Sequence, residues 1–120
     1  VHAVKFRNED GVILESGMSN QGTGIDVLHV FIFRNSGARE LTPREGIATH
    51  VNNCGAVDDG KECYSIEGAW RADPGGRVVV HYTGHDENKR HVDQQIVYEL
   101  RNNKLELVFG QVPSKIIDFR

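Results

Sequence analysis

Short runs in which apolar and polar residues alternate fill most of the chain. Strict alternation is typical of a β-strand with one buried face, because successive side chains of a strand point to opposite sides. The alternation is clearest at residues 62–71, 91–100 and 104–110. The whole pattern predicts about eight strands within one β domain, residues 1–120. Eight antiparallel strands can form either a closed barrel or a two-sheet sandwich, and the sequence leaves both open.

The alternation is interrupted between residues 39 and 51, where the pattern is ambiguous. Thr42-Pro43-Arg44-Glu45 fits a helix capping box with proline at the first helical position. Ile47 and Val51 would then lie one helical turn apart. We therefore expect one short helix near residues 43–52. Elsewhere, Asn8-Glu9-Asp10-Gly11 predicts a hairpin turn, and residues 115–120 are expected to form the last strand.

Composition supports a β fold and excludes some functions. The chain has 22 Val and Ile residues against 12 Leu and Ala, and β-branched side chains favour strands. A net charge of −3 argues against a general nucleic-acid binder. No apolar run is long enough to cross a bilayer, so we expect no membrane span.

The two cysteines, Cys54 and Cys63, bracket a turn-rich stretch. If residues 57–60 form a four-residue loop, antiparallel pairing places the cysteines directly opposite each other, close enough for a disulfide. Two free thiols are the alternative, and the spacing fits no usual zinc or redox motif. A disulfide would indicate a secreted or periplasmic protein.

Residues 25–34 are apolar on both faces, which is unusual for an antiparallel strand. Leu28 lies on one face, and Phe31 and Phe33 lie on the other. Exposed apolar rows mark partner contacts or self-association. We therefore select Leu28, Phe31 and Phe33 as candidate protein-contact residues. The alternative is that the predicted helix buries this strand.

The stretch from residue 66 to residue 110 resembles small bacterial lipocalin-like (calycin-type) β-barrel domains. Gly68-Ala69-Trp70 is similar to the Gly-x-Trp motif that opens such barrels. Tyr98-Glu99-Leu100, an Asn turn and Lys104-Leu105-Glu106-Leu107 are similar to their closing hairpin. About 65 residues precede Gly-x-Trp here, whereas the motif usually sits on the first strand. The resemblance implies a non-enzymatic binding or inhibitory domain.

Several aromatic residues could line a ligand cavity in a barrel of this size. The candidates are Tyr64, Trp70, Tyr82, Tyr98 and Phe109. For Trp70 the alternative is a core aromatic beside a glycine that makes room for it.

Three histidines, His81, His85 and His91, lie close together in the sequence. In a hairpin His81 and His91 could face each other, and His85 would have to fold back over them to complete a metal site. The spacing matches no strong metal motif, so ordinary surface histidines are the alternative.

These patterns favour a secreted or periplasmic, non-catalytic binding protein without a cofactor. Its partner would be a small apolar ligand, another protein (as for an inhibitor or immunity factor) or a second copy in a homo-oligomer. The alternative function is a metal-dependent protein that uses His81, His85 and His91. No nucleophile elbow or nucleotide-binding glycine motif is present in the sequence.

Overall fold

A computed structural model describes residues 2–20, 22–55 and 63–117. Within these residues the chain forms nine strands and one short helix. The elements are β1 (His2–Phe6), β2 (Glu9–Asn20), β3 (Thr23–Arg34), β4 (Gly37–Glu40), β5 (Ile47–Asn52), β6 (Ser65–Asp73), β7 (Arg77–His85), β8 (His91–Arg101), β9 (Lys104–Phe109) and α1 (Ser114–Ile117). In this part of the chain no helix is long and apolar enough to span a membrane.

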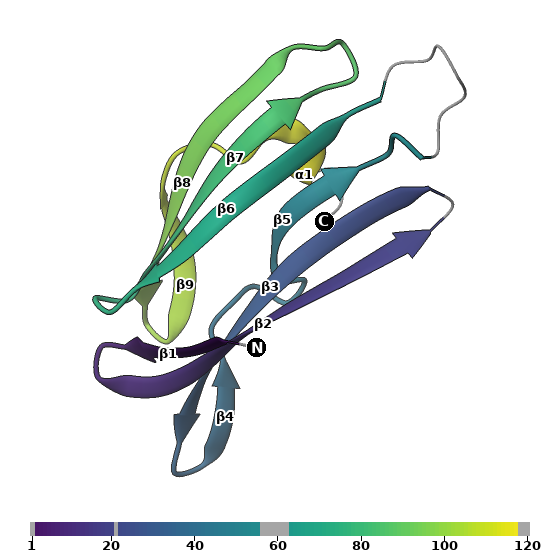
Figure 1. The fold of residues 1–120 in the computed structure, drawn as a ribbon. Coiled ribbons are helices and arrows are strands. Elements are labelled where there is room, and N and C mark those ends of the chain that lie inside the picture. Colours follow the sequence, from purple (N-terminus) through teal and green to yellow (C-terminus); the bar gives the residue numbers. More distant parts are fainter. Residues whose placement is uncertain (1, 21, 56–62, 118–120) are drawn as a thin grey trace.

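All strands belong to one antiparallel sheet (Figure 1). The order is β1-β2-β3-β5-β6-β7-β8-β9, and β4 pairs with β3 beyond the end of β5. The prediction of a mainly β, antiparallel fold is confirmed. The sheet is not closed, and its shape is compatible with either a barrel or a sandwich.

The predicted helix near residues 43–52 is wrong. Gly46 has a φ of 80°, which ends any helical turn, and its N–H donates to the Pro43 carbonyl at 2.7 Å. Residues 43–46 therefore form a tight turn. The β-branched Ile47 and Val51 then pair with β3 and β6 as part of β5. β4 and β5 both pair with β3, and segment 41–46 is the loop that connects them.

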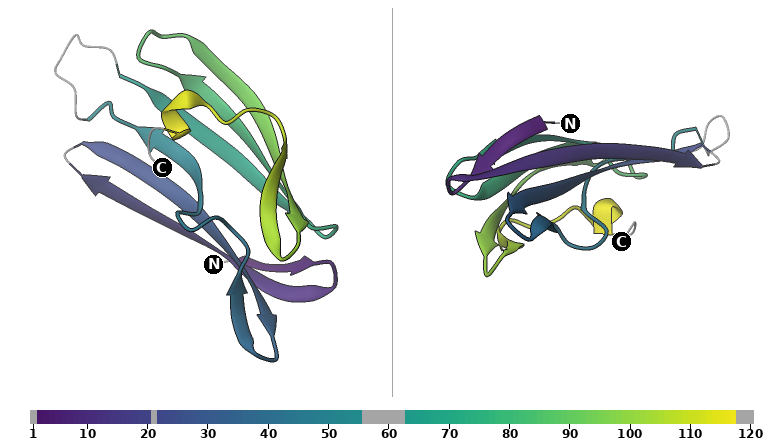
Figure 2. Two further views of the ribbon diagram at one scale, coloured as in Figure 1. Left: turned by 180° about the vertical axis from the view of Figure 1, so that it is seen from behind. Right: turned by 90° about the horizontal axis from the view of Figure 1, so that it is seen from below.

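Two other local predictions need correction. The first hairpin turns at Arg7 and Asn8, which both have positive φ, so Gly11 lies inside β2. At the other end, residues 114–117 form α1 instead of a strand, and residues 118–120 lie outside the described residues. Figure 2 shows α1 on one side of the sheet, beside β5. Ile116 is completely buried there.

The hydrophobic core contacts both faces of β3. Leu28, Val30 and Ile32 are completely buried on one face, whereas Ile25 and Val27 pack against the core from the other. This change of face coincides with a register shift between β3 and β5. Val27 pairs with Ala48 and Asp26 with His50, so Thr49 is an extra residue, a β-bulge.

One end of the sheet is held together by backbone contacts between distant strands. Arg7 N–H donates to the Pro74 carbonyl at 2.8 Å, which joins the β1–β2 turn to the β6–β7 turn. The Leu105 N–H donates to the Leu41 carbonyl at 2.8 Å, which joins β9 to the end of β4. At the opposite end β2 and β3 extend away from these contacts (Figure 1).

Candidate functional site

Two grooves border the C-terminal half of β2, one on each face of the β2–β3 hairpin. We call the larger, of about 660 Å³, the acidic groove; it is lined by Glu15, Ser16, Gly17, Asp26, Thr49, His50, Glu67, Gly68, Ala69 and Trp70. We call the smaller, of about 490 Å³, the apolar groove; it is lined by Ser16, Gly17, Met18, Ile25, Val27, Glu45, Gly46 and Ala48. Ser16 and Gly17 border both grooves, so β2 is the wall that they share.

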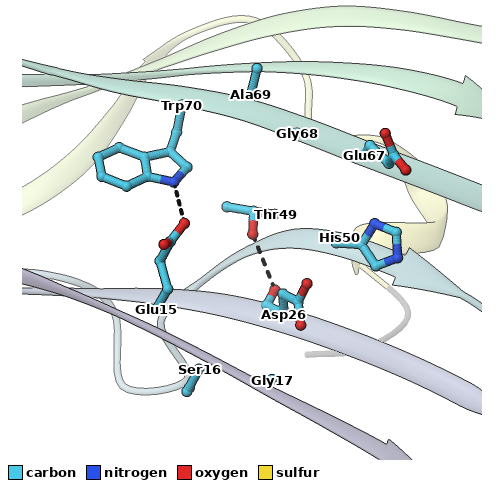
Figure 3. Close-up of a pocket in the computed structure, with 10 residues that line it drawn as sticks. All are labelled: Glu15, Ser16, Gly17, Asp26, Thr49, His50, Glu67, Gly68, Ala69 and Trp70. Carbon is cyan, nitrogen blue, oxygen red and sulfur yellow. Dashed lines mark hydrogen bonds between the residues drawn. The ribbon is translucent and has the colours of Figure 1, made fainter. Parts of the chain in front are cut away.

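The acidic groove contains a row of four residues in register across four strands, three of which bear polar side chains (Figure 3). Gly17 pairs with Asp26, Asp26 with His50, and His50 with Glu67. The side chains of Asp26, His50 and Glu67 have no hydrogen-bond or ion-pair partner within the described residues. The bulge at Thr49 produces the row, because it aligns the exposed face of β6 with the Asp26 face of β3.

Trp70 extends from β6 across the acidic groove to β2 (Figure 3). Its indole Nε1 donates to Oε1 of Glu15 at 2.7 Å, and His2 Nε2 lies 3.1 Å from Oε2 of the same carboxylate. The His2 ring also packs edge-on against Trp70, with 5.2 Å between ring centroids. The Trp70 bond, followed by the His2 bond, lowers the pKa of Glu15 below its ordinary value. Glu15 is therefore held as a carboxylate.

Small residues leave space for this groove. A Cβ atom at Gly17 would collide with the Asp26 carboxylate, which leans over the glycine. A Cβ atom at Gly68 would lie 2.8 Å from the Thr49 carbonyl oxygen and 3.1 Å from Tyr82 Cε1. The Thr49 hydroxyl in turn donates to the Asp26 carbonyl at 3.5 Å. Gly17 thus makes room on β2 for the Asp26 side chain of β3, and Gly68 allows β6 to approach β5.

The face of the hairpin that bears the apolar groove is rich in exposed apolar side chains. Leu14, Met18 and Phe33 are 36%, 71% and 52% exposed. They share this face, which we call the hairpin face, with the half-buried Val12, Ile25, Val27 and Phe31, because Val12 pairs with Phe31 and Met18 with Ile25. His29 lies among them, 2.6 Å from a Glu40 carboxylate oxygen. Apolar surface thus continues along both strands.

The predicted protein-contact residues divide between core and surface. Phe33 is exposed and Phe31 half-buried on the hairpin face. Leu28 is completely buried on the opposite face, so it stabilises the core and cannot contact a partner. Sequence periodicity separated the two faces, but it could not show which one the rest of the sheet covers.

The predicted ligand-binding aromatics do not come together. Tyr82 and Tyr98 are buried in the core, and the Tyr82 hydroxyl donates to the Ala48 carbonyl at 2.5 Å. Tyr64 lies immediately before β6, beneath the Lys115 ammonium, whereas Phe109 is 62% exposed on β9. Of the five, Trp70 alone lines one of the two grooves.

The histidines of the predicted metal site are also dispersed. His85 pairs with His91 across the β7–β8 hairpin, but His81 lies four residues along β7, about 13 Å away at the usual strand rise. His81 instead bonds Asp93, with 2.5 Å between Nε2 and Oδ1, which lowers the pKa of Asp93. No group of three or more potential ligands that could hold a metal ion occurs within residues 2–20, 22–55 and 63–117.

Cys54 and Cys63 form the predicted disulfide, with 4.9 Å between their Cα atoms. The ladder between β5 and β6 leads directly to it. Asn52 pairs with Ser65, and Asn53 N–H then donates to the Tyr64 carbonyl at 3.2 Å. The cysteines are the next pair in the same register. The predicted loop at 57–60 lies outside the described residues.

No protein-family model, curated protein or solved structure matches the chain.

Proposed function

We propose that this chain is a non-catalytic, protein-binding domain whose contact surface is the hairpin face. The observation that carries the proposal is the apolar hairpin face, where half-buried apolar side chains of β2 and β3 link the exposed Leu14, Met18 and Phe33. Contiguous exposed apolar surface of this kind marks sites of protein interaction, whereas single scattered apolar residues need no explanation.

The arrangement of the aromatic residues favours a protein partner over a small apolar ligand inside a barrel. Tyr82 and Tyr98, which would line such a cavity, pack against the core instead. The apolar groove on the hairpin face could receive one apolar side chain of a partner, with Phe33 and Leu14 contacting the surface around it. This is the contact expected of an inhibitor or immunity-type protein.

A secreted or periplasmic location is part of the same proposal. The Cys54–Cys63 disulfide supports it, because such bonds persist in oxidising compartments. The relationship to lipocalin-like domains stays a proposal as well; the antiparallel β-sheet is compatible with it, whereas Trp70 lies on β6 and not on the first strand.

Two matched double variants test the contact surface. Leu14→Ser/Phe33→Ser removes apolar surface from the hairpin face, and Leu107→Ser/Phe109→Ser removes similarly exposed side chains from β9. Each immobilised protein is incubated with extracellular or periplasmic extract of its source, and any captured protein is purified and titrated back. We expect the β9 variant to retain the wild-type partner and the hairpin variant to bind it at least ten-fold more weakly. Equal binding by both variants would reject the hairpin face as the contact.

A further inference from the structure

Within residues 2–20, 22–55 and 63–117, the C-terminal half of β2 is an unpaired sheet edge. Within the described residues β1 pairs with β2 as far as Ile13, and residues 14–20 pair with β3 alone (Figure 1). No other backbone hydrogen bond reaches residues 14–20 from the described part of the chain. Alternate N–H and C=O groups of this segment are therefore available to another strand.

The two faces beside this edge differ in chemistry. Glu15 and Gly17 face the acidic groove, to which Asp26 and Glu67 add two further carboxylates. Its lining includes no Lys or Arg from the described residues. Ser16 and Met18 face the apolar groove. A strand paired with β2 would point alternate side chains into these two environments.

Gly17 belongs both to the unpaired edge of β2 and to the lining of the acidic groove. A residue opposite Gly17 on an added strand meets no side chain there, and the Asp26 carboxylate leans over the glycine from β3. The added strand and β3 would lie about 10 Å apart, two strand spacings, with β2 between them. A long basic side chain can cross that gap above Gly17, whereas a short one cannot.

We propose that residues 14–20 of β2 bind an extended segment of a partner protein by strand addition, and that this segment alternates basic and apolar residues. This inference rests on the proposed function and names the partner's chemistry. Basic side chains opposite Glu15 and Gly17 enter the acidic groove, and apolar side chains opposite Ser16 and Met18 enter the apolar groove. Main-chain hydrogen bonds supply affinity, and the two grooves supply specificity.

A second copy of this chain does not fit the same edge. Residues 14–20 contain no Lys or Arg, so pairing two copies along this segment brings Glu15 no cation in any register. The acidic groove therefore selects a partner of different sequence.

The first experiment uses the peptide acetyl-Val-Lys-Val-Lys-Val-Lys-Val-amide and its counterpart with Glu in place of Lys. Trp70, the single tryptophan, lies in the acidic groove and reports binding by its fluorescence. We expect the Lys peptide to bind at least ten-fold more tightly than the Glu peptide. Asp26→Asn should weaken binding about two- to five-fold, as for a partly exposed ion pair. Glu106→Gln, which removes an exposed carboxylate on β9, should leave it unchanged.

The second experiment tests strand pairing itself. The Lys peptide is made in two N-methylated forms, one methylated at the odd positions and one at the even positions. In a strand only one of these sets donates toward β2, so one form should lose binding and the other should keep it. Equal affinity of the two forms, equal affinity of the Lys and Glu peptides, or no binding of the Lys peptide would overturn the inference. Partner capture that still depends on Leu14 and Phe33 would leave the proposed function standing in each case.

Discussion

Trp70 and Glu15 lie 55 residues apart in the sequence and share a hydrogen bond of 2.7 Å. The bond joins β6 to β2 beyond the last pair of β5 with β6, which is His50 with Glu67 (Figure 3). It adds a side-chain link between the β2–β3 hairpin and β6 to the pairing of β3 with β5, and it forms one end of the acidic groove. The single tryptophan thus reports directly on the candidate site.

The Trp70–Glu15 contact should depend on pH. The Trp70 and His2 bonds lower the pKa of Glu15 below the ordinary 4.5, so the native state favours the carboxylate more than the unfolded chain does. The resulting stability is present above pH 4.5 and is lost as pH falls through the lowered pKa. In a fluorescence titration we expect a Trp70 transition with its midpoint below 4.5.

Two substitutions decide whether Glu15 causes that transition. Glu15→Gln has no titrating group, so the transition should disappear. Glu87→Gln removes a different carboxyl of lowered pKa, one in the β7–β8 turn that is paired with Lys115, and should leave the transition in place. A transition that persists in Glu15→Gln would show that another group controls Trp70.

β5 and β6 lie so close together at Gly68 that an added methyl group should destabilise the protein. In Gly68→Ala the new Cβ would lie 2.8 Å from the Thr49 carbonyl oxygen and 2.9 Å from Val80 Cγ1. We expect urea unfolding to show a loss of roughly 1–3 kcal/mol, as for other overpacked sites. Gly24→Ala is the matched control, because its nearest neighbour would be the Met18 carbonyl at 3.9 Å. A loss in Gly24→Ala as large as that in Gly68→Ala would contradict the steric explanation.

Truncation of Leu28 and of Phe33, both on β3, should affect stability to very different extents. Leu28→Ala leaves a cavity in the core and should cost about 2–5 kcal/mol of unfolding free energy. Phe33→Ala removes a side chain that is 52% exposed and should change stability by no more than about 0.5 kcal/mol. Thermal and urea unfolding measure both. A strongly destabilised Phe33→Ala protein would mean that the hairpin face is covered in the monomer.

The disulfide should stabilise the chain by restricting its unfolded state. Cys54 and Cys63 are separated by nine positions, and a loop of this length corresponds to roughly 2–3 kcal/mol. Cys54→Ser/Cys63→Ser should therefore lower the free energy of unfolding by that amount. Reduction of the wild-type protein provides the control, and we expect it to give the same loss. An unchanged unfolding midpoint after reduction would contradict this prediction.

Alternation predicted most of the strands because it reports local burial, which each segment encodes by itself. The disulfide also followed from local sequence, because its two cysteines continue the register of the neighbouring strands β5 and β6 beyond their ends. The turn at Gly46 was missed because Pro43 and Glu45 also suit a helix start, and only pairing with β3 excludes that conformation. Asp26 and His50 were missed as site residues because a bulge at Thr49 aligns them. Bulges leave no periodic signal.

The bulge at Thr49 also determines which surfaces of the sheet can change in sequence without affecting each other. Because this one extra residue in β5 resets the alternation, the exposed side chains of the hairpin face lie on the opposite side of the sheet from Glu67, an exposed residue of β6. Substitutions can therefore alter the recognition surface of the hairpin without requiring matching changes in β6–β9. An insertion or deletion within β5 would instead exchange buried and exposed positions along one side of the molecule. The length of β5 is thus more constrained than the composition of the surfaces it joins.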